Sequence, residues 1–228
     1  MPVLPGSPPV DVELRRSARA RRFSLRVSRL DGRVTLSLPQ GAREAEAMAF
    51  LRAQEGWVRA ALARMPGMAV VRVGHTVPFE GRLLTVVTGT GRSVRIADDS
   101  MIVPGDPARA AIKAMAYLKL MARDRLSAAC DLHAGRLGRQ FSGLSLRDTR
   151  SRWGSCTSDG ALMFSWRLIM APPAVLDYVA AHEVAHLVQM NHSPAFWAVV
   201  QGLCPGYGVH RAWLRGQGQS LHGYRFGD

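Results

Sequence analysis

The chain has 228 residues, of which 47% are hydrophobic, and this is enough for one large or two small globular domains with a packed core. Its formal net charge at pH 7 is +13, which favours association with an anionic partner, and it contains no run of about 18 apolar residues of the kind that spans a membrane. These properties argue against a disordered chain and against a protein with membrane-spanning helices.

Most of the basic charge comes from arginine, because Lys113 and Lys119 are the only lysines. A GC-rich genome produces this bias without any functional pressure. The composition therefore leaves open whether the basic surface contacts nucleic acid.

The sequence gives two indications of the compartment. The first 22 residues, MPVLPGSPPVDVELRRSARARR, lack the apolar stretch and the cleavage site of a secretory signal. The cysteines are odd in number and widely spaced, which is typical of reduced thiols: Cys130, Cys156 and Cys204. We therefore expect a cytoplasmic protein with no membrane contact.

The N-terminal half reads as a β-rich module with one helix. Residues 1–12 are rich in proline and predict a disordered start. Apolar and polar residues alternate on both sides of Asp31-Gly32, which predicts a β-hairpin over residues 21–39. Residues 41–65 have the apolar spacing of an amphipathic helix, and residues 70–104 are rich in β-branched residues. The helix is expected to turn four residues toward a core: Met48, Leu51, Trp57 and Val58.

The character of the sequence changes at Asp106-Pro107, an N-cap residue followed by proline at the first helical position. This pair predicts a long helix that runs to about His133. We therefore expect one module over residues 13–105 and a second domain over residues 106–228. In the second domain, Ser158-Asp159-Gly160 predicts a hairpin, and Pro172-Pro173 predicts the start of another helix.

That last helix carries a histidine cluster in the segment HEVAHLVQMNH. Residues four apart lie on one face of a helix, so His182 and His186 can present two imidazole nitrogens to one ion. Glu183 lies beside them and is suited to take a proton from an activated water. This spacing predicts a metal site that has its own general base.

A third histidine joins the cluster only if the helix ends before it. In a continuous helix His192 would be rotated by roughly 240° from His186, away from the ion. Ser193-Pro194 predicts the start of a new helix, and Asn191 is a residue type that tolerates the left-handed conformation at a helix end. His192 is therefore expected in a turn that brings its ring back to the ion.

The cluster has two alternative interpretations. The histidines of an ordinary helix are usually surface residues or hydrogen-bonded core residues, but here the spacing, the glutamate and the helix break agree. A closed structural zinc site needs a fourth protein ligand, for which Cys156 or Cys204 would have to serve. Three histidines instead leave one position open for water.

Three segments resemble the YgjP-like family of predicted zinc-dependent hydrolases, which is related to the SprT and WLM zincin metallopeptidases. They are SRWGSC from Ser151, LDYVAAHEVAHLVQMNHSPAFW from Leu176 and CPGYGVHRAWLR from Cys204. A looser likeness extends over the N-terminal RRSARARRFSLRVSRLDGRVTLSLP. Metzincins have glycine where this chain has Gln189, and their later methionine turn is not found here, so their substrate rules are not transferred.

The resemblance implies an α+β protein, with a β-rich module before a zincin-like domain that contains a long helix, a small antiparallel sheet and a metal-binding helix. It implies one zinc ion per chain, held by His182, His186 and His192, with Glu183 as the base. Candidates for stabilising an oxyanion or contacting substrate are chosen only by their place near the motifs. These candidates are Tyr207, His210, Arg211 and Arg152.

The expected activity is metal-assisted hydrolysis, with a peptide or protein as the leading substrate. Nucleotide phosphoanhydride hydrolysis remains an alternative, because an activated water also attacks phosphorus and arginines bind phosphates. A second alternative is a nucleic-acid-binding protein in which the zinc half is a non-catalytic scaffold.

Overall fold

The computed structural model describes residues 2–28, 32–63 and 68–227, and the chain divides into two compact units, Met1–Gly67 and Met68–Asp228. Each unit has its own hydrophobic core. Within the described residues, no helix is both long enough and apolar enough to cross a membrane. The architecture is α+β, as expected from the sequence.

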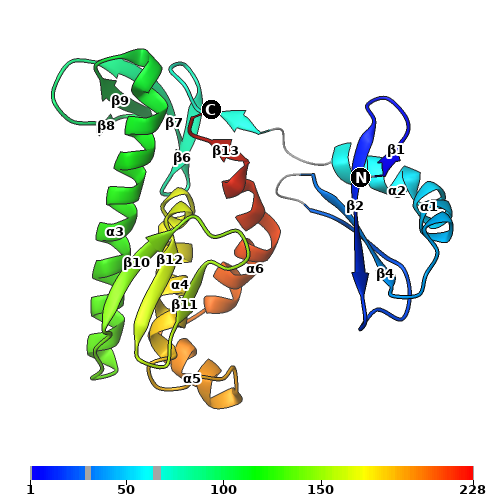
Figure 1. Cartoon of the computed structure of the whole chain (residues 1–228). Helices are drawn as coiled ribbons and strands as arrows, with labels where there is room; N and C mark the ends of the chain where they lie inside the picture. The colour runs from blue at the N-terminus through cyan, green and yellow to red at the C-terminus, as the bar shows by residue number, and fades with distance from the viewer. Residues whose placement is uncertain (1, 29–31, 64–67, 228) are drawn as a thin grey trace. The chain divides into compact units, whose positions relative to one another are not determined.

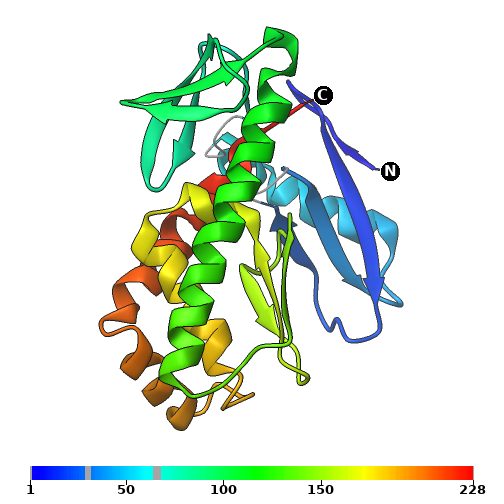
Figure 2. The same cartoon turned by 90° about the vertical axis from the view of Figure 1, so that its left-hand side faces the viewer.

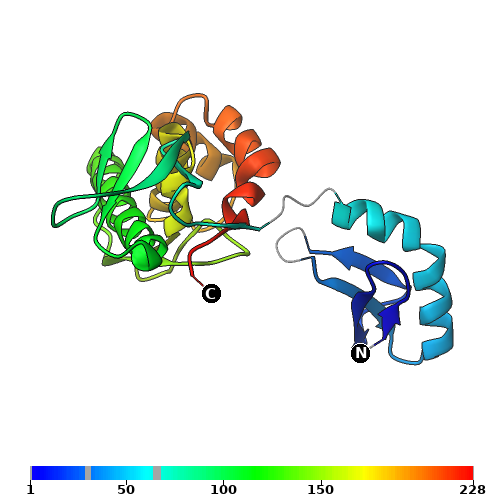
Figure 3. The same cartoon turned by 90° about the horizontal axis from the view of Figure 1, so that it is seen from above.

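The first unit is a four-stranded sheet in the order β1-β2-β4-β3 with two helices on one face (Figure 3). Strand β2 pairs parallel with β4, and β3 pairs antiparallel with β4 as the predicted hairpin, whose Asp31 lies outside the described residues. The elements are β1 (Val3–Leu4), β2 (Val10–Ser17), β3 (Ser24–Val27), β4 (Val34–Pro39), α1 (Glu44–Ala53) and α2 (Glu55–Ala63).

Two features of this unit differ from the expectation. The disordered start expected over residues 1–12 is not found among the described residues of that range, because β1 pairs with β2 and Leu4 is fully buried in the core. The single helix expected over 41–65 is two helices, which meet at Gln54. Leu51 and Val58 are buried as expected, but Trp57 is 50% exposed, because α2 turns its Val58 side toward the sheet.

The second unit begins with a four-stranded sheet in the order β6-β7-β9-β8, which lies at one end of the long helix α3 (Figure 1, Figure 2). The first elements of the second unit are β5 (Ala69–Val70), β6 (Thr76–Phe79), β7 (Arg82–Gly89), β8 (Arg95–Ala97), β9 (Ser100–Pro104) and α3 (Ala110–Arg136). Asp106 caps the chain before α3, where its side chain accepts a hydrogen bond from the Ala108 N–H at 2.9 Å.

The expected module boundary after residue 105 falls inside this unit. Leu84 of β7 and Met101 of β9 share one buried core with Ala114 and Leu118 of α3. The sheet therefore packs on the helix that follows it, and the division of the chain lies earlier, before Met68.

The other end of α3 packs beside a three-stranded sheet and against the first of the helices that follow it (Figure 1). The sheet has the order β10-β12-β11, and it is mixed, because β10 runs parallel to β12 whereas β11 forms the predicted antiparallel hairpin with β12. The elements are β10 (Gly143–Arg147), β11 (Gly154–Cys156), β12 (Ala161–Ser165), α4 (Pro173–Ala185), α5 (Pro194–Leu203), α6 (Tyr207–Gln217) and β13 (Tyr224–Arg225).

Candidate functional site

The histidine cluster lies where α4 ends. Pro173 occupies the first turn of α4, as the Pro172-Pro173 pair predicts, and the helix continues through His182 to Ala185, with His186 as its C-cap. The next helix, α5, starts at Pro194 after Ser193, whose hydroxyl accepts a hydrogen bond from the Phe196 N–H at 3.4 Å. The predicted helix break before His192 is therefore present.

The turn between these helices uses no left-handed residue. Among the described residues, the only non-glycine residues with positive φ are Glu80 and Asp98, so Asn191 does not adopt the conformation anticipated for it. Its side-chain oxygen instead accepts a hydrogen bond from the Ser193 N–H at 3.3 Å. Because the turn needs no positive φ, a glycine is not required at Gln189.

This turn brings the three histidine rings together. Their candidate ligand atoms all lie within 4.8 Å of one another, and Nε2 of His182 is 3.1 Å from Nε2 of His192. The Nδ1 atom of His186 lies 3.0 Å from the Gln189 carbonyl oxygen; a hydrogen bond donated by Nδ1–H would leave Nε2 free as a ligand atom. Neither Cys156 nor Cys204, which a closed structural site would need, belongs to this group.

Burial favours the neutral form of His182 and of His186. Burial lowers the pKa of His182 to about 4, with further lowering by His186, His192 and Arg211. Burial also lowers the pKa of His186. Phe196 is fully buried beneath the cluster, and its ring centre lies 4.5 to 4.9 Å from those of the three histidines. Neutral imidazole is the form that binds a metal ion.

Glu183 lies on α4 against strand β11. It is 6% exposed, and burial raises its pKa to about 8, although the charge of Arg152 opposes that rise. A Cβ atom on Gly154 would lie only 2.6 Å from both Cγ and Oε1 of Glu183. The strand can approach the glutamate this closely because residue 154 has no side chain.

Gly154 was not singled out in the sequence, although a glycine inside a strand is a recognised sign of close backbone approach. The four candidates for stabilising an oxyanion or contacting substrate lie in different places. Tyr207 and Arg211 reach the site through Trp197, whose ring is 5.2 Å from that of Tyr207 and 4.5 Å from the guanidinium carbon of Arg211. The positive charge of Arg152 lowers the pKa of Glu183 and so opposes the effect of burial. For His210, the described residues give no hydrogen bond, ion pair or ring contact with the site.

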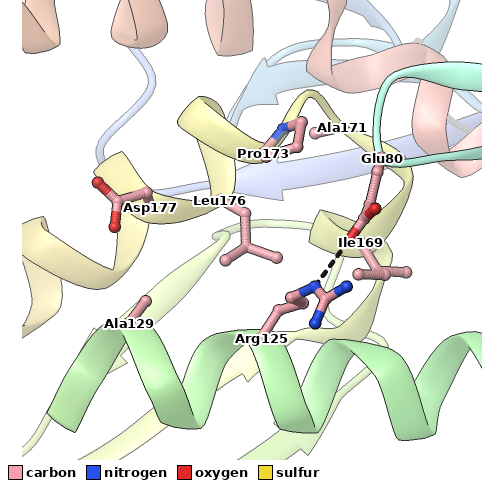
Figure 4. Close-up of a pocket in the computed structure, with 8 residues that line it drawn as sticks. All are labelled: Glu80, Arg125, Ala129, Ile169, Ala171, Pro173, Leu176 and Asp177. Atoms are coloured by element: carbon pink, nitrogen blue, oxygen red, sulfur yellow. Dashed lines mark hydrogen bonds and ion pairs between the residues drawn. The ribbon is translucent and has the colours of Figure 1, made fainter. Parts of the chain in front are cut away.

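A separate pocket of about 170 Å³ lies between α3 and α4 (Figure 4). Its charged groups are paired: Arg125 with Glu80 at 2.7 Å, and Asp177 with Nε2 of His133 at 2.9 Å. Asp177 is rotated by about 140° around α4 from His182. The pocket is therefore not part of the histidine site.

Comparison with protein families identifies one family that matches most of the chain. The family model described as YgjP-like, metallopeptidase domain, matches residues 21–217. The crystal structure of the metallopeptidase zymogen of Pyrococcus abyssi abylysin is similar with a TM-score of 0.36 and 19% identity, over 40% of this chain and 93% of that one. No curated protein matches the chain. Since the family match covers most of the sequence, including both units, the chain belongs to the YgjP-like metallopeptidase family.

Proposed function

We propose that the protein is a zinc-dependent metallopeptidase in which His182, His186 and His192 hold the ion and Glu183 is the general base. The observation that carries this proposal is the convergence of three imidazoles beside a buried glutamate in a chain of a metallopeptidase family.

The spacing of the nitrogens supports an ion at this group. A tetrahedral zinc ion with bonds of 2.0–2.1 Å requires ligand nitrogens about 3.3 Å apart. The Nε2 atoms of His182 and His192 are 3.1 Å apart. Nitrogen donors also favour zinc over magnesium or calcium, which prefer oxygen.

The ion, Glu183 and Gly154 have separate roles in the proposed hydrolysis. When bound, zinc supplies Lewis acidity, which polarises a substrate carbonyl and lowers the pKa of an attacking water. Glu183 accepts the proton of that water and returns it to the leaving amine. Gly154 holds the carboxylate in place by allowing β11 to pack against it.

Strand β11 also offers a way to bind an extended peptide. It is an edge strand of its sheet, so one side of its backbone pairs with no strand among the described residues. An edge of this kind binds extended peptides through main-chain hydrogen bonds. A peptide paired with β11 would lie next to Glu183, which packs on the same strand.

The test is hydrolysis by zinc-loaded protein of a panel of peptides and unfolded proteins, with nucleoside triphosphates as a second arm. We expect new amino termini, and we expect the Glu183→Gln variant to keep its zinc but lose this product. Release of phosphate or pyrophosphate that depends on Glu183, without new amino termini, would contradict the proposal and indicate a nucleotide hydrolase.

The ligand assignment has its own test. His182→Ala and His186→Ala should each lose zinc together with activity. A zinc content that stays at one per chain in either variant would show that the assigned ligands are wrong.

A further inference from the structure

An aromatic wall formed by Trp197 and Tyr207 extends from the histidine cluster to helix α6. The Trp197 ring centre lies 5.6 Å from that of His182 and 5.7 Å from that of His192. Tyr207 stacks on Trp197 with an angle of 15° between the rings. Both side chains are half-buried, so the wall reaches the surface beside the site.

Arg211 lies at the end of this wall. Its guanidinium carbon is 4.5 Å from the Trp197 ring centre, a cation–π contact that limits the positions of the long side chain. Within the described ranges, no acidic side chain forms an ion pair with Arg211 and no group accepts a hydrogen bond from it. Its N–H donors are therefore free to bind an anion from outside the chain.

The distance from Arg211 to the histidines fits a short peptide. The contacts through Trp197 put the guanidinium carbon at most about 10 Å from the His182 ring centre. An extended peptide advances by about 3.3 to 3.6 Å per residue. A group within about three residues of a bond cleaved at the histidine cluster can thus reach Arg211.

We propose that Arg211 is a specificity-determining residue that binds a carboxylate of the peptide substrate near the scissile bond. This inference rests on the proposed peptidase function. A planar guanidinium pairs with a carboxylate through two parallel hydrogen bonds, and stacking on Trp197 prepares it for that geometry. The carboxylate is either the free C-terminus of a short peptide or an Asp or Glu side chain.

Binding is measured separately from cleavage. Zinc-loaded Glu183→Gln protein is titrated against fluorescent peptides of one sequence, compared as C-terminal acid and amide, and with internal Glu or Gln. We expect peptides that carry the recognised carboxylate to bind about tenfold or more tightly than their neutral counterparts. The acid–amide pair and the Glu–Gln pair show which source supplies the carboxylate.

The variants identify the residue responsible. In the Glu183→Gln background, a further Arg211→Gln substitution should abolish the preference for the charged peptide. Arg211→Lys should keep only part of this preference, because an ammonium lacks the two parallel N–H donors of a guanidinium. Arg215→Gln, one turn further along α6 and exposed, is the matched control and should leave the preference unchanged. Circular dichroism of each variant shows whether its fold is intact.

Three results would overturn the inference: equal binding of charged and neutral peptides, a preference that survives Arg211→Gln, or no binding of any peptide. The proposed function fails separately. If wild-type protein cleaves peptides without an Arg211-dependent preference, only the inference is lost. If the preference is present but no peptide is cleaved, Arg211 still binds carboxylates and the peptidase proposal fails.

Discussion

Replacing Gly154 with alanine tests whether strand β11 positions the proposed base. The added Cβ would lie 2.6 Å from Cγ and Oε1 of Glu183 and 2.8 Å from its Cδ, whereas an unstrained contact is about 3.5 Å. The carboxylate must therefore move by about 1 Å or β11 must shift. Overpacking of this kind costs about 1 to 3 kcal/mol of stability.

The substitution should also slow catalysis. A displacement of about 1 Å in a catalytic group lowers the rate by roughly a hundredfold. We therefore expect Gly154→Ala to fold and to keep its zinc, while kcat/KM for a cleaved peptide falls by about that factor. The assays are peptide hydrolysis, metal content and urea unfolding.

Gly143→Ala is the matched control. Gly143 lies in β10 of the same sheet, and a Cβ at this position would meet nothing within 4 Å. It should retain wild-type activity. If Gly154→Ala is as active as this control, then close packing against β11 does not position Glu183, and the reasoning is refuted.

Two further predictions concern the packing behind the site. Arg167 is 9% exposed and donates two hydrogen bonds to Asp148, at 2.6 and 3.0 Å, so Arg167→Met should lower the free energy of unfolding by about 3 kcal/mol, whereas Arg215→Met should change it by under about 0.5 kcal/mol. Urea unfolding measures both variants, and equal effects would show that the hydrogen bonds of the buried Arg167 do not contribute. Burial lowers the pKa of His222 to about 4, with Arg167 and Arg150 lowering it further and Asp148 opposing them. The stability due to this ring is therefore fully present above its unfolded pKa of about 6.5 and is lost as the pH falls toward 4. The difference in unfolding free energy between wild type and His222→Phe should change over that window, and a constant difference would contradict the pKa assignment.

Much of the candidate site could be predicted because it depends on local geometry. The four-residue spacing of His182 and His186 puts both on one helix face, and Ser193-Pro194 starts a new helix whatever surrounds it. The turn between the two helices then places His192 close to both. The hairpin at residues 158–160 and the Asp106 cap are equally local, and both are present.

What the sequence by itself determined is therefore the type of most elements and the histidine–glutamate pattern, since these depend on residues a few positions apart. Only the tertiary structure decided which core each element joins, because apolar periodicity does not identify the partner surface. It decided that Leu4 belongs to the first core and that β6–β9 pack on α3. It also brought Gly154 to Glu183 and Arg211 to Trp197, contacts between segments that no spacing within one segment predicts.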